Sequence, residues 1–349
     1  MKFDSIKCAI VVAALEGAVS AAPSPKGRFS VKTFKGPKLG LVSRVTGSGP
    51  SAASTNFMNM TFGDQTFPME IDTGSSALWL FNTGTPSNEQ GGHPLYNPNA
   101  SSTFQLQDGY SFDIEYADGT GMTGPVGTED VTMAGITIQG QYIGWLSGHG
   151  AKPIYYDAHI PENTWHQNAE PLLDQPVWTV DFYSTQDGSM DFGYIDDSKY
   201  QGDIAYAPCD FSNGAWSFNI TGWNVPNDSV QTGSGSVQSI ADTGTPSSSL
   251  PQGVLDYYYG KVDGSSRDSS DDTAYVVPCD ADLPDLILTI EGGTVTIPGS
   301  QMNAGTVDGG CRGAFYITTG GGNLGSAMFN SNFVVYSQTN AQIGFALKA

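Results

Sequence analysis

Basic residues are scarce in this chain of 349 residues, which holds 14 Lys and Arg against 35 Asp and Glu and has a formal net charge of −21. Eight of the 14 precede residue 51, together with two acidic residues, so the rest carries a net charge of −27. A surface this acidic repels phosphate backbones and anionic lipids, so we expect neither nucleic acid nor a membrane as partner. It suits an acidic medium, in which many carboxylates are protonated.

Motifs of several enzyme classes are also missing. No HExxH sequence accompanies His149, His159 and His166, so we interpret these as surface histidines and expect no metal. No GxSxG sequence occurs, which argues against a serine hydrolase of the nucleophile-elbow type. Residues 320–325 match GxGxxG formally, but no helical pattern or βαβ unit follows, so we expect a loop and no cofactor.

Residues 1–22 predict a signal peptide. Lys2 and Lys7 form a positive start, Cys8–Leu15 is a short apolar run, and small residues at 18–22 offer a cleavage site. Eight apolar residues cannot span a bilayer, which needs about 20. We therefore expect a soluble, secreted, extracellular protein.

Cysteine is scarce as well, and its use fits secretion. Cys8 would leave with the signal, so three cysteines remain. Cys279 and Cys311 lie 32 residues apart in a strand-rich stretch and are a plausible disulfide. Cys209 would then be a leftover thiol, interpreted as a small buried apolar residue. Candidate N-glycosylation sequences begin at Asn59, Asn99, Asn219 and Asn227.

The texture of the chain changes near residue 55. Residues 23–50 are basic, rich in Pro and Gly and without helical or strand periodicity, so we interpret them as a pro-segment or linker from which no core can be built. Beyond them, short strand-like runs alternate with turn residues and predict an all-β protein. Such runs are 56–62, 66–72, 78–82, 110–116, 131–133, 136–138, 177–182, 286–290 and 333–336. The best helical pattern is Gln252–Val262.

One long-range repeat carries the candidate chemistry. An apolar strand that ends in Asp-Thr-Gly occurs at residues 69–75 and again at 239–245, which places Asp72 and Asp242 170 residues apart. A single Asp-Thr-Gly is an ordinary turn, since Asp and Gly dominate turns. Two matched copies, each at the end of an apolar strand, indicate a shared function.

Two such aspartates suit the hydrolysis of an amide. Without a metal or a covalent intermediate, this reaction needs a nucleophilic water and a polarised carbonyl at the same time. The ionised carboxylate can take a proton from water while the protonated one donates to the carbonyl oxygen. Two like charges at hydrogen-bond distance cannot both ionise, so close apposition keeps one protonated. We predict Asp72 and Asp242 as the catalytic pair.

The residues after each aspartate fit this chemistry. The threonine can bond across a pseudo-two-fold axis, the glycine lets the backbone approach a carboxylate closely, and the next residue supplies a hydroxyl. These residues are Thr73, Gly74 and Ser75 in the first copy and Thr243, Gly244 and Thr245 in the second.

Longer stretches extend the pattern well beyond the tripeptides. They are IDTGSSALWLF (71–81), GHPLYNP (92–98), IEYADGTGMTG (114–124), DFGYIDDSKYQGDIAYAP (191–208), SIADTGT (239–245) and QIGFAL (342–347). Through them the chain resembles the pepsin family of aspartic proteases, and its fungal penicillopepsin- or aspergillopepsin-like branch in particular. The likeness covers roughly residues 55–145 and 177–345.

The resemblance implies a bilobal all-β fold with pseudo-two-fold related lobes and a cleft between them. We place the N-terminal lobe at 51–185 and the C-terminal lobe at 186–349. A monomer is expected that cleaves proteins or peptides and is inhibited by pepstatin-like compounds. The basic segment 23–50 would cover the acidic cleft near neutral pH and leave when carboxylates protonate.

The resemblance also implies a mobile hairpin, the flap, that closes over the substrate. Tyr116 would lie on it and bond to Trp79. Asp118 and Thr120 fall where flap residues of this branch help some members accept Lys before the cleaved bond, with Gly119 between them.

Residues 142–176 depart from the family. They are shorter than usual and lack the Asp-Gly-Leu-Leu-Gly-Leu-type segment that threads behind the first Asp-Thr-Gly loop. The second-lobe counterpart survives partly as Asn323–Ser326, with Ser326 where Asp is usual, and residues 246–249 replace a Thr and an apolar run. A misplacement of 1 Å could lower the rate about 10²-fold.

Two hypotheses follow. The first is a secreted endopeptidase active at acid pH. The alternative is a catalytically impaired homologue that only binds peptide or protein, or a mis-spliced form of an active one. A carbohydrate-binding β-sandwich would not explain the paired loops.

Overall fold

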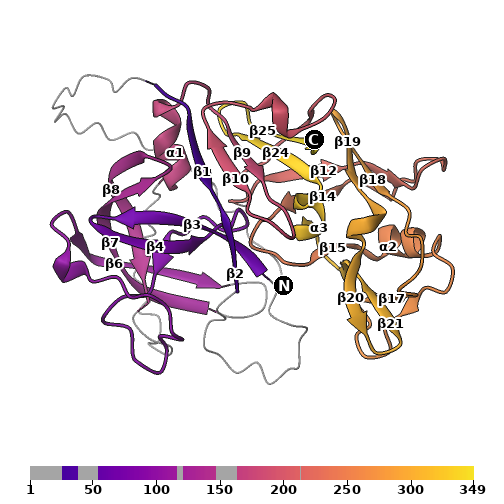
Figure 1. Ribbon diagram of the computed structural model, residues 1–349, viewed down its shortest axis with the longest axis horizontal. Coiled ribbons are helices and arrows are strands. Elements are labelled where there is room, and N and C mark those ends of the chain that lie inside the picture. The colour runs from indigo at the N-terminus through magenta and orange to yellow at the C-terminus, as the bar shows by residue number, and fades with distance from the viewer. Residues whose placement is uncertain (1–25, 38–53, 116–120, 147–162, 213) are drawn as a thin grey trace.

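The structure is a computed structural model that describes residues 26–37, 54–115, 121–146, 163–212 and 214–349. Strands dominate it. In Figure 1 the strands of the first half, indigo to magenta, lie on one side, and those of the second half, orange to yellow, lie on the other. Strands from both halves meet between them in one sheet. The all-β, two-lobed prediction is confirmed.

The N-terminal lobe is a seven-stranded sheet in which β2, β3, β7, β8 and β5 follow one another, β4 pairs with β3, and β6 pairs with β7. Its strands are β2 (Phe34–Pro37), β3 (Ser54–Phe62), β4 (Gln65–Glu70), β5 (Trp79–Leu80), β6 (Gln105–Glu115), β7 (Gly121–Met133) and β8 (Ile136–Trp145). Alternate residues of β3 (Met58, Met60 and Phe62) are buried, as the two-residue period of a strand requires.

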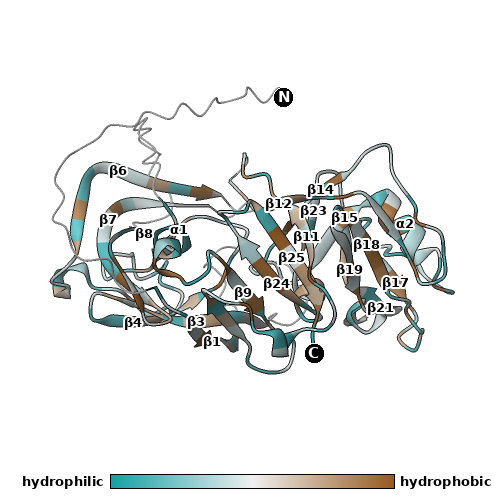
Figure 2. Cartoon of the chain, turned by 90° about the horizontal axis from the view of Figure 1, so that it is seen from above, coloured by the Kyte–Doolittle hydropathy of each residue, from teal (hydrophilic) through white to brown (hydrophobic). Residues whose placement is uncertain are grey.

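A six-stranded sheet joins the lobes in the order β1, β10, β9, β24, β25, β11. The strands are β1 (Phe29–Lys32), β9 (Trp178–Asp181), β10 (Ser189–Phe192), β11 (Ala205–Pro208), β24 (Asn332–Ser337) and β25 (Gln342–Leu347). Every residue of β9 and β24 is buried, so both faces of the sheet are covered. Figure 2 shows the apolar bands along β9 and β25.

The C-terminal lobe adds three sheets, of which the five-stranded one, in the order β12, β14, β23, β15, β22, carries the second loop. The strands are β12 (Ser217–Ile220), β13 (Gly222–Asn224), β14 (Val237–Ala241), β15 (Ser248–Pro251), β16 (Ser266–Arg267), β17 (Tyr275–Val277), β18 (Leu286–Ile290), β19 (Gly293–Ile297), β20 (Asn303–Val307), β21 (Gly310–Gly313), β22 (Phe315–Thr318) and β23 (Gly322–Leu324). The helices are α1 (Trp165–Ala169), α2 (Gln252–Tyr259) and α3 (Ser326–Phe329), with 3-10 turns η1 (Pro98–Ala100), η2 (Glu170–Leu172), η3 (Asp197–Lys199) and η4 (Gly299–Gln301).

Most of the local predictions are confirmed. Each expected strand run overlaps a strand. The predicted helix is α2, which buries Val254, Leu255, Tyr258 and Tyr259 and ends at Tyr259, three residues earlier than expected. Within the described residues, no helix is long and apolar enough to cross a membrane.

The expectation that residues 23–50 lack regular structure is wrong for residues 29–37. β1 pairs antiparallel with β10, Phe29 opposite Phe192, and β2 pairs with β3. Thr33 between them is fully buried. A strand at a sheet edge needs backbone bonds to one neighbour only, and the four residues of β1 do alternate between apolar and polar. Residues 1–25 and 38–53, with the signal peptide, lie outside the described part of the chain.

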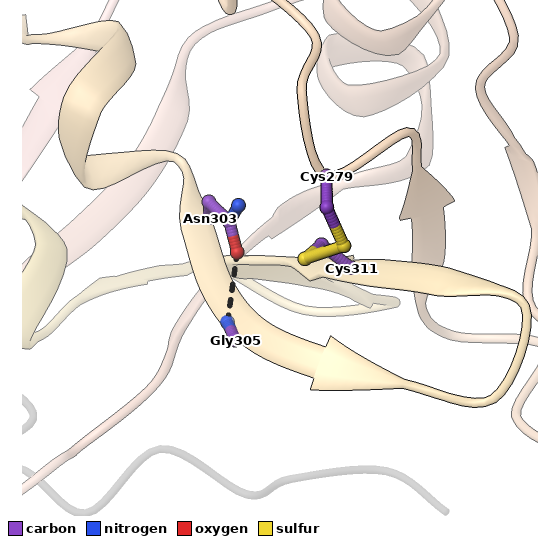
Figure 3. Close-up of a disulfide and its surroundings, with 4 residues drawn as sticks. All are labelled: Cys279, Asn303, Gly305 and Cys311. Atoms are coloured by element: carbon purple, nitrogen blue, oxygen red, sulfur yellow. Dashed lines mark hydrogen bonds between the residues drawn. A yellow bond between two sulfur atoms is a disulfide. The ribbon is translucent and has the colours of Figure 1, made fainter.

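Cys279 and Cys311 form a disulfide in the C-terminal lobe (Figure 3). Cys311 lies in β21, and the neighbouring strand β20 carries an irregularity at which the Gly305 amide donates to Asn303 Oδ1 at 2.8 Å. Cys209 is a free, half-buried thiol packed against the main core, and burial raises its pKa to about 12.

Candidate active site

The two Asp-Thr-Gly loops occupy equivalent places in the two lobes. Asp72 comes two residues after the end of β4, and Asp242 directly follows β14. The Ile71 amide donates to the Asn56 carbonyl at 3.0 Å and the Asp242 amide to the Leu324 carbonyl at 3.0 Å, so each loop is tied to its own lobe.

The threonines of the loops bond across the boundary between the lobes. The Thr73 amide donates to Thr243 Oγ1 at 3.0 Å, and the Thr243 amide donates to Thr73 Oγ1 at 3.0 Å. Thr73 Oγ1 donates to the Ala241 carbonyl and Thr243 Oγ1 to the Ile71 carbonyl, both at 2.7 Å. The bonds match pairwise, as a pseudo-two-fold axis between the loops requires.

Two donors of its own loop hold the Asp72 carboxylate. The Gly74 amide donates to Oδ1 at 2.8 Å, and Ser75 Oγ donates to Oδ2 at 2.5 Å. Such charge-assisted bonds fix the plane of the carboxylate.

Three donors hold Asp242. The Gly244 amide donates to Oδ1 at 2.9 Å, and the Thr245 hydroxyl donates to Oδ2. The third is Asn323 Nδ2, which comes from β23 and lies 3.0 Å from Oδ2. The sequence motif predicts the first two donors but gives no sign of the role of Asn323.

Each carboxylate lies against the glycine of the opposite loop. A Cβ added at Gly74 would lie 2.6 Å from Asp242 Cγ, and one added at Gly244 would lie 2.6 Å from Asp72 Oδ1. Real Cβ atoms do not approach other atoms so closely. The glycines are therefore what allows the two carboxyl groups to meet.

The pair is poised to share a proton. Burial raises the pKa of Asp72 from its ordinary value to about 6, and the negative charge of Asp242 and a hydrogen bond between the two carboxyl groups add to the rise. The bonds from Ser75 and Gly74 oppose it. Asp72 therefore tends to hold a proton in moderate acid, while its neighbour accepts hydrogen bonds from three donors.

The two loops differ in what lies behind them. β23 runs parallel to β14 behind the second loop, and the Gly325 amide then donates to Ser248 Oγ at 2.9 Å. No described strand pairs in parallel with β4, and Ala77 is exposed where its counterpart, Ser247, is partly buried. Of the atypical block 142–176, residues 147–162 lie outside the described residues.

Part of the expected flap is described. The stem of the β6–β7 hairpin pairs as far as Glu115 opposite Gly121. Trp79 in β5 is partly buried and packs edge-on against Phe81, with ring centroids 5.4 Å apart. The remaining predicted flap residues lie outside the described residues: Tyr116, Asp118, Gly119 and Thr120.

Tyr336 is a second residue that sequence analysis missed. Its hydroxyl donates to the Ala241 carbonyl at 3.3 Å and lies 3.4 Å from Thr73 Oγ1, and its ring is fully buried against Trp178, with centroids 3.9 Å apart. It thus supports the threonine pair from the central sheet. A signal existed, since Tyr336 ends a predicted strand, but an aromatic residue in a strand is usually core.

The interpretation of the histidines as surface residues is wrong for His166. The short helix α1 packs its side chain beside Trp178 and Trp216, with ring centroids 5.7 Å and 6.0 Å away, and burial lowers its pKa. His149 and His159 are outside the described residues. Among the residues that the structure describes, no three His, Cys, Asp or Glu side chains are grouped so as to hold a metal ion.

Comparisons with known proteins agree with this geometry. The family model of eukaryotic aspartyl proteases matches residues 58–157 and 146–348, and the two matches overlap within the atypical block. Aspartic protease pepA of Arthroderma gypseum is 34% identical over 338 residues, 87% of this chain and 83% of that protein. Penicillopepsin-1 of Penicillium janthinellum is 34% identical over 328 residues, 88% of this chain and 99% of that protein. Aspergillopepsin-1 of Aspergillus oryzae is 33% identical over 335 residues, 89% of this chain and 84% of that protein.

Proposed function

We propose that this chain, which belongs to the eukaryotic aspartyl protease family, is a secreted endopeptidase. Members of the family hydrolyse peptide bonds, and in this protein Asp72 and Asp242 would do so at acid pH. The observation that carries the proposal is the matched pair of carboxylates, each held by donors of its own loop and packed against the glycine of the other.

In the proposed mechanism a water lies between the two carboxyl groups. Ionised Asp242 takes a proton from the water while protonated Asp72 donates its proton to the carbonyl oxygen, and the water oxygen bonds to the carbonyl carbon. The resulting diol returns a proton to Asp72, Asp242 passes its proton to the amide nitrogen, and the C–N bond breaks. The assignment rests on the hydrogen bonds, because three donors hold the Asp242 carboxylate and two hold that of Asp72.

The same pair of carboxyl groups explains why activity is proposed at acid pH. Catalysis needs one proton on the two carboxyl groups, and this proton is lost as the pH rises through the pKa of Asp72, about 6. The strongly acidic chain beyond residue 50 is also less self-repelling in acid.

The substrate is proposed to be a protein or peptide bound as an extended strand, because backbone bonds give affinity without narrow sequence choice. The flap would close over it, and pepstatin-like compounds would occupy the same place. Besides the catalytic pair, the proposed contact residues are Gly74, Ser75, Trp79, Tyr116, Asp118, Gly119, Thr120, Gly244 and Thr245.

Residues 1–22 are proposed to direct secretion and residues 23–50 to act as a pro-segment that leaves in acid. Two features support docking of the pro-segment: β1 and β2 extend the sheets, and Arg28 Nε lies 3.2 Å from Asp174 Oδ2. The disulfide fits an extracellular protein, and a monomer is proposed.

The test is cleavage of a denatured protein by the secreted product across about pH 2.5–7, with and without pepstatin, beside Asp72→Asn and Asp242→Asn. We expect an acid activity that pepstatin blocks and that either substitution abolishes. A folded protein freed of residues 23–50 that cleaves nothing at any pH would overturn the proposal and leave a protein that only binds peptides.

A further inference from the structure

Asn323 lies in the middle of β23 and faces the second catalytic loop. It pairs with Ile240 of β14 on one side and with Ser249 of β15 on the other. Both of its neighbours in the strand are buried, so the alternation of a strand directs its side chain to the opposite face. There its Nδ2 lies 3.0 Å from Asp242 Oδ2 and 3.0 Å from Thr245 Oγ1.

The surrounding bonds determine which end of the amide faces Asp242. The Thr245 hydroxyl donates its hydrogen to Asp242 Oδ2, so at its other side the Thr245 oxygen can only accept. Both atoms near the amide are therefore acceptors, and only the NH₂ end of Asn323 fits between them. The opposite amide orientation would place its oxygen against a carboxylate.

The other end of the amide supports the same conclusion. Asn323 Oδ1 is buried and has no hydrogen-bond partner among the described residues. A buried, unpaired carbonyl oxygen is unfavourable, so the bonds at the nitrogen must offset it. The bond from Asn323 Nδ2 to the Asp242 carboxylate is therefore one of the contacts that hold this side chain in place.

The described part of the first loop shows no counterpart. Asp72 accepts from Gly74 and Ser75 of its own loop, whereas Asp242 accepts from a third donor that another strand supplies. Hydrogen bonds to a carboxylate favour its ionised form. The extra donor therefore makes two otherwise matched carboxyl groups unequal.

We propose that Asn323 is a positioning residue that keeps Asp242 ionised, and so assigns it the role of base while Asp72 carries the proton. The inference rests on the proposed function and adds to it a residue that sets the acid side of the pH range. Without this donor, Asp242 would take up a proton at higher pH, and the site would lose its ionised member sooner on acidification.

The test compares wild type with Asn323→Leu, which keeps the approximate size and removes the donor. Carbon-13 NMR of labelled aspartate carboxyls measures the titration of Asp242 in the pro-segment-free protein, whether or not it is active. We expect the midpoint to move up by roughly one pH unit, which corresponds to about a tenfold change in proton affinity. An unchanged midpoint in a folded Asn323→Leu protein would overturn the inference.

The pH profile of kcat/KM supplies a second readout. The acid limb of Asn323→Leu should shift upward by a similar amount, so that the loss of activity is largest at the lowest pH and fades as the pH rises. An equal loss at every pH would mean a merely structural role and would also overturn the inference. Gln238→Leu, the same kind of change at an exposed position of β14, should alter neither readout. Inactive wild type would contradict the proposed function alone, because the NMR titration still decides the role of Asn323.

Discussion

Thr73 and Thr243 each accept a hydrogen bond from the amide of the other at 3.0 Å, although they belong to different lobes. Each hydroxyl also donates to the carbonyl of the residue that precedes the opposite aspartate, Ala241 or Ile71. The two loops thus form one unit whose four bonds set the separation of the carboxyl groups. A change at either threonine acts on both lobes.

Thr73→Val should therefore destabilise the protein and lower its activity. Valine keeps the shape but leaves the Thr243 amide without a partner, at about 1–3 kcal/mol, and leaves the Ala241 carbonyl with only the longer bond from the Tyr336 hydroxyl. We expect a lower melting temperature and at least a tenfold loss of kcat, from misplaced carboxyls. Thr73→Ser keeps the hydroxyl and should stay near wild type. A valine variant with wild-type kcat would contradict the role of this bond.

Gly244→Ala should abolish activity by steric means. The new Cβ would meet Asp72 Oδ1 at 2.6 Å, so the carboxylate or the loop must move. We expect a loss of about 10²-fold or more in kcat/KM, measured with a chromogenic peptide. Gly253→Ala in α2 is the matched control, because its Cβ would meet nothing within 4 Å. It should leave activity unchanged and stabilise the helix slightly. Full activity of Gly244→Ala would show that the carboxylate does not need this position.

The parts of the fold that could be predicted are those with local signals. Apolar and polar residues alternate at the start of β8, the run in β24 is apolar and aromatic, and the helix α2 has a buried face, so these elements can be predicted from neighbouring residues. Asp72 and Asp242 could be predicted because the loop occurs twice with the same residues in the same order.

The parts that could not be predicted depend on contacts between distant residues. Asn323 meets Asp242 across 81 positions because β23 pairs with β14 in one particular register. Nothing near Asn323 in the sequence indicates that register, since a shift by one residue would turn the side chain away. The strand β1 was missed for a related reason: a four-residue strand is stabilised by β10, which lies about 160 residues further on, and hardly at all by its own composition.

Loss of the disulfide should lower stability but spare the catalytic chemistry. Cys279 and Cys311 close a loop of 32 residues in the C-terminal lobe, away from both aspartates in sequence. Removing such a bond releases about 3–4 kcal/mol of loop-closure entropy in the unfolded chain. We expect Cys311→Ser to lower the melting temperature, and a reductant to have that effect on wild type but not on the variant. Cys209→Ala is the control, and its melting temperature should respond to reductant as wild type does.

Asp72→Asn should stabilise the protein at neutral pH while it removes activity. The pKa of Asp72 is about 6 in the folded protein, against an ordinary value of 3.8, so the folded state holds this proton more tightly than the unfolded state. The unfavourable contribution of Asp72 is therefore absent below pH 3.8, grows as the pH rises to 6 and is complete above it.

Asparagine cannot ionise, so the Asp72→Asn protein lacks this unfavourable contribution to its stability. We expect a gain on the order of 3 kcal/mol in the free energy of unfolding at pH 7, and almost none at pH 3, by urea titration. Asp113→Asn, at an exposed position of β6, should give no such difference between the two pH values. An Asp72→Asn protein that is less stable than wild type at pH 7 would mean that the charged carboxylate is favourable where it lies. The hydrogen bonds to Asp72 would then outweigh the burial and the negative neighbour that raise its pKa. The assignment of Asp72 as the proton donor would fail.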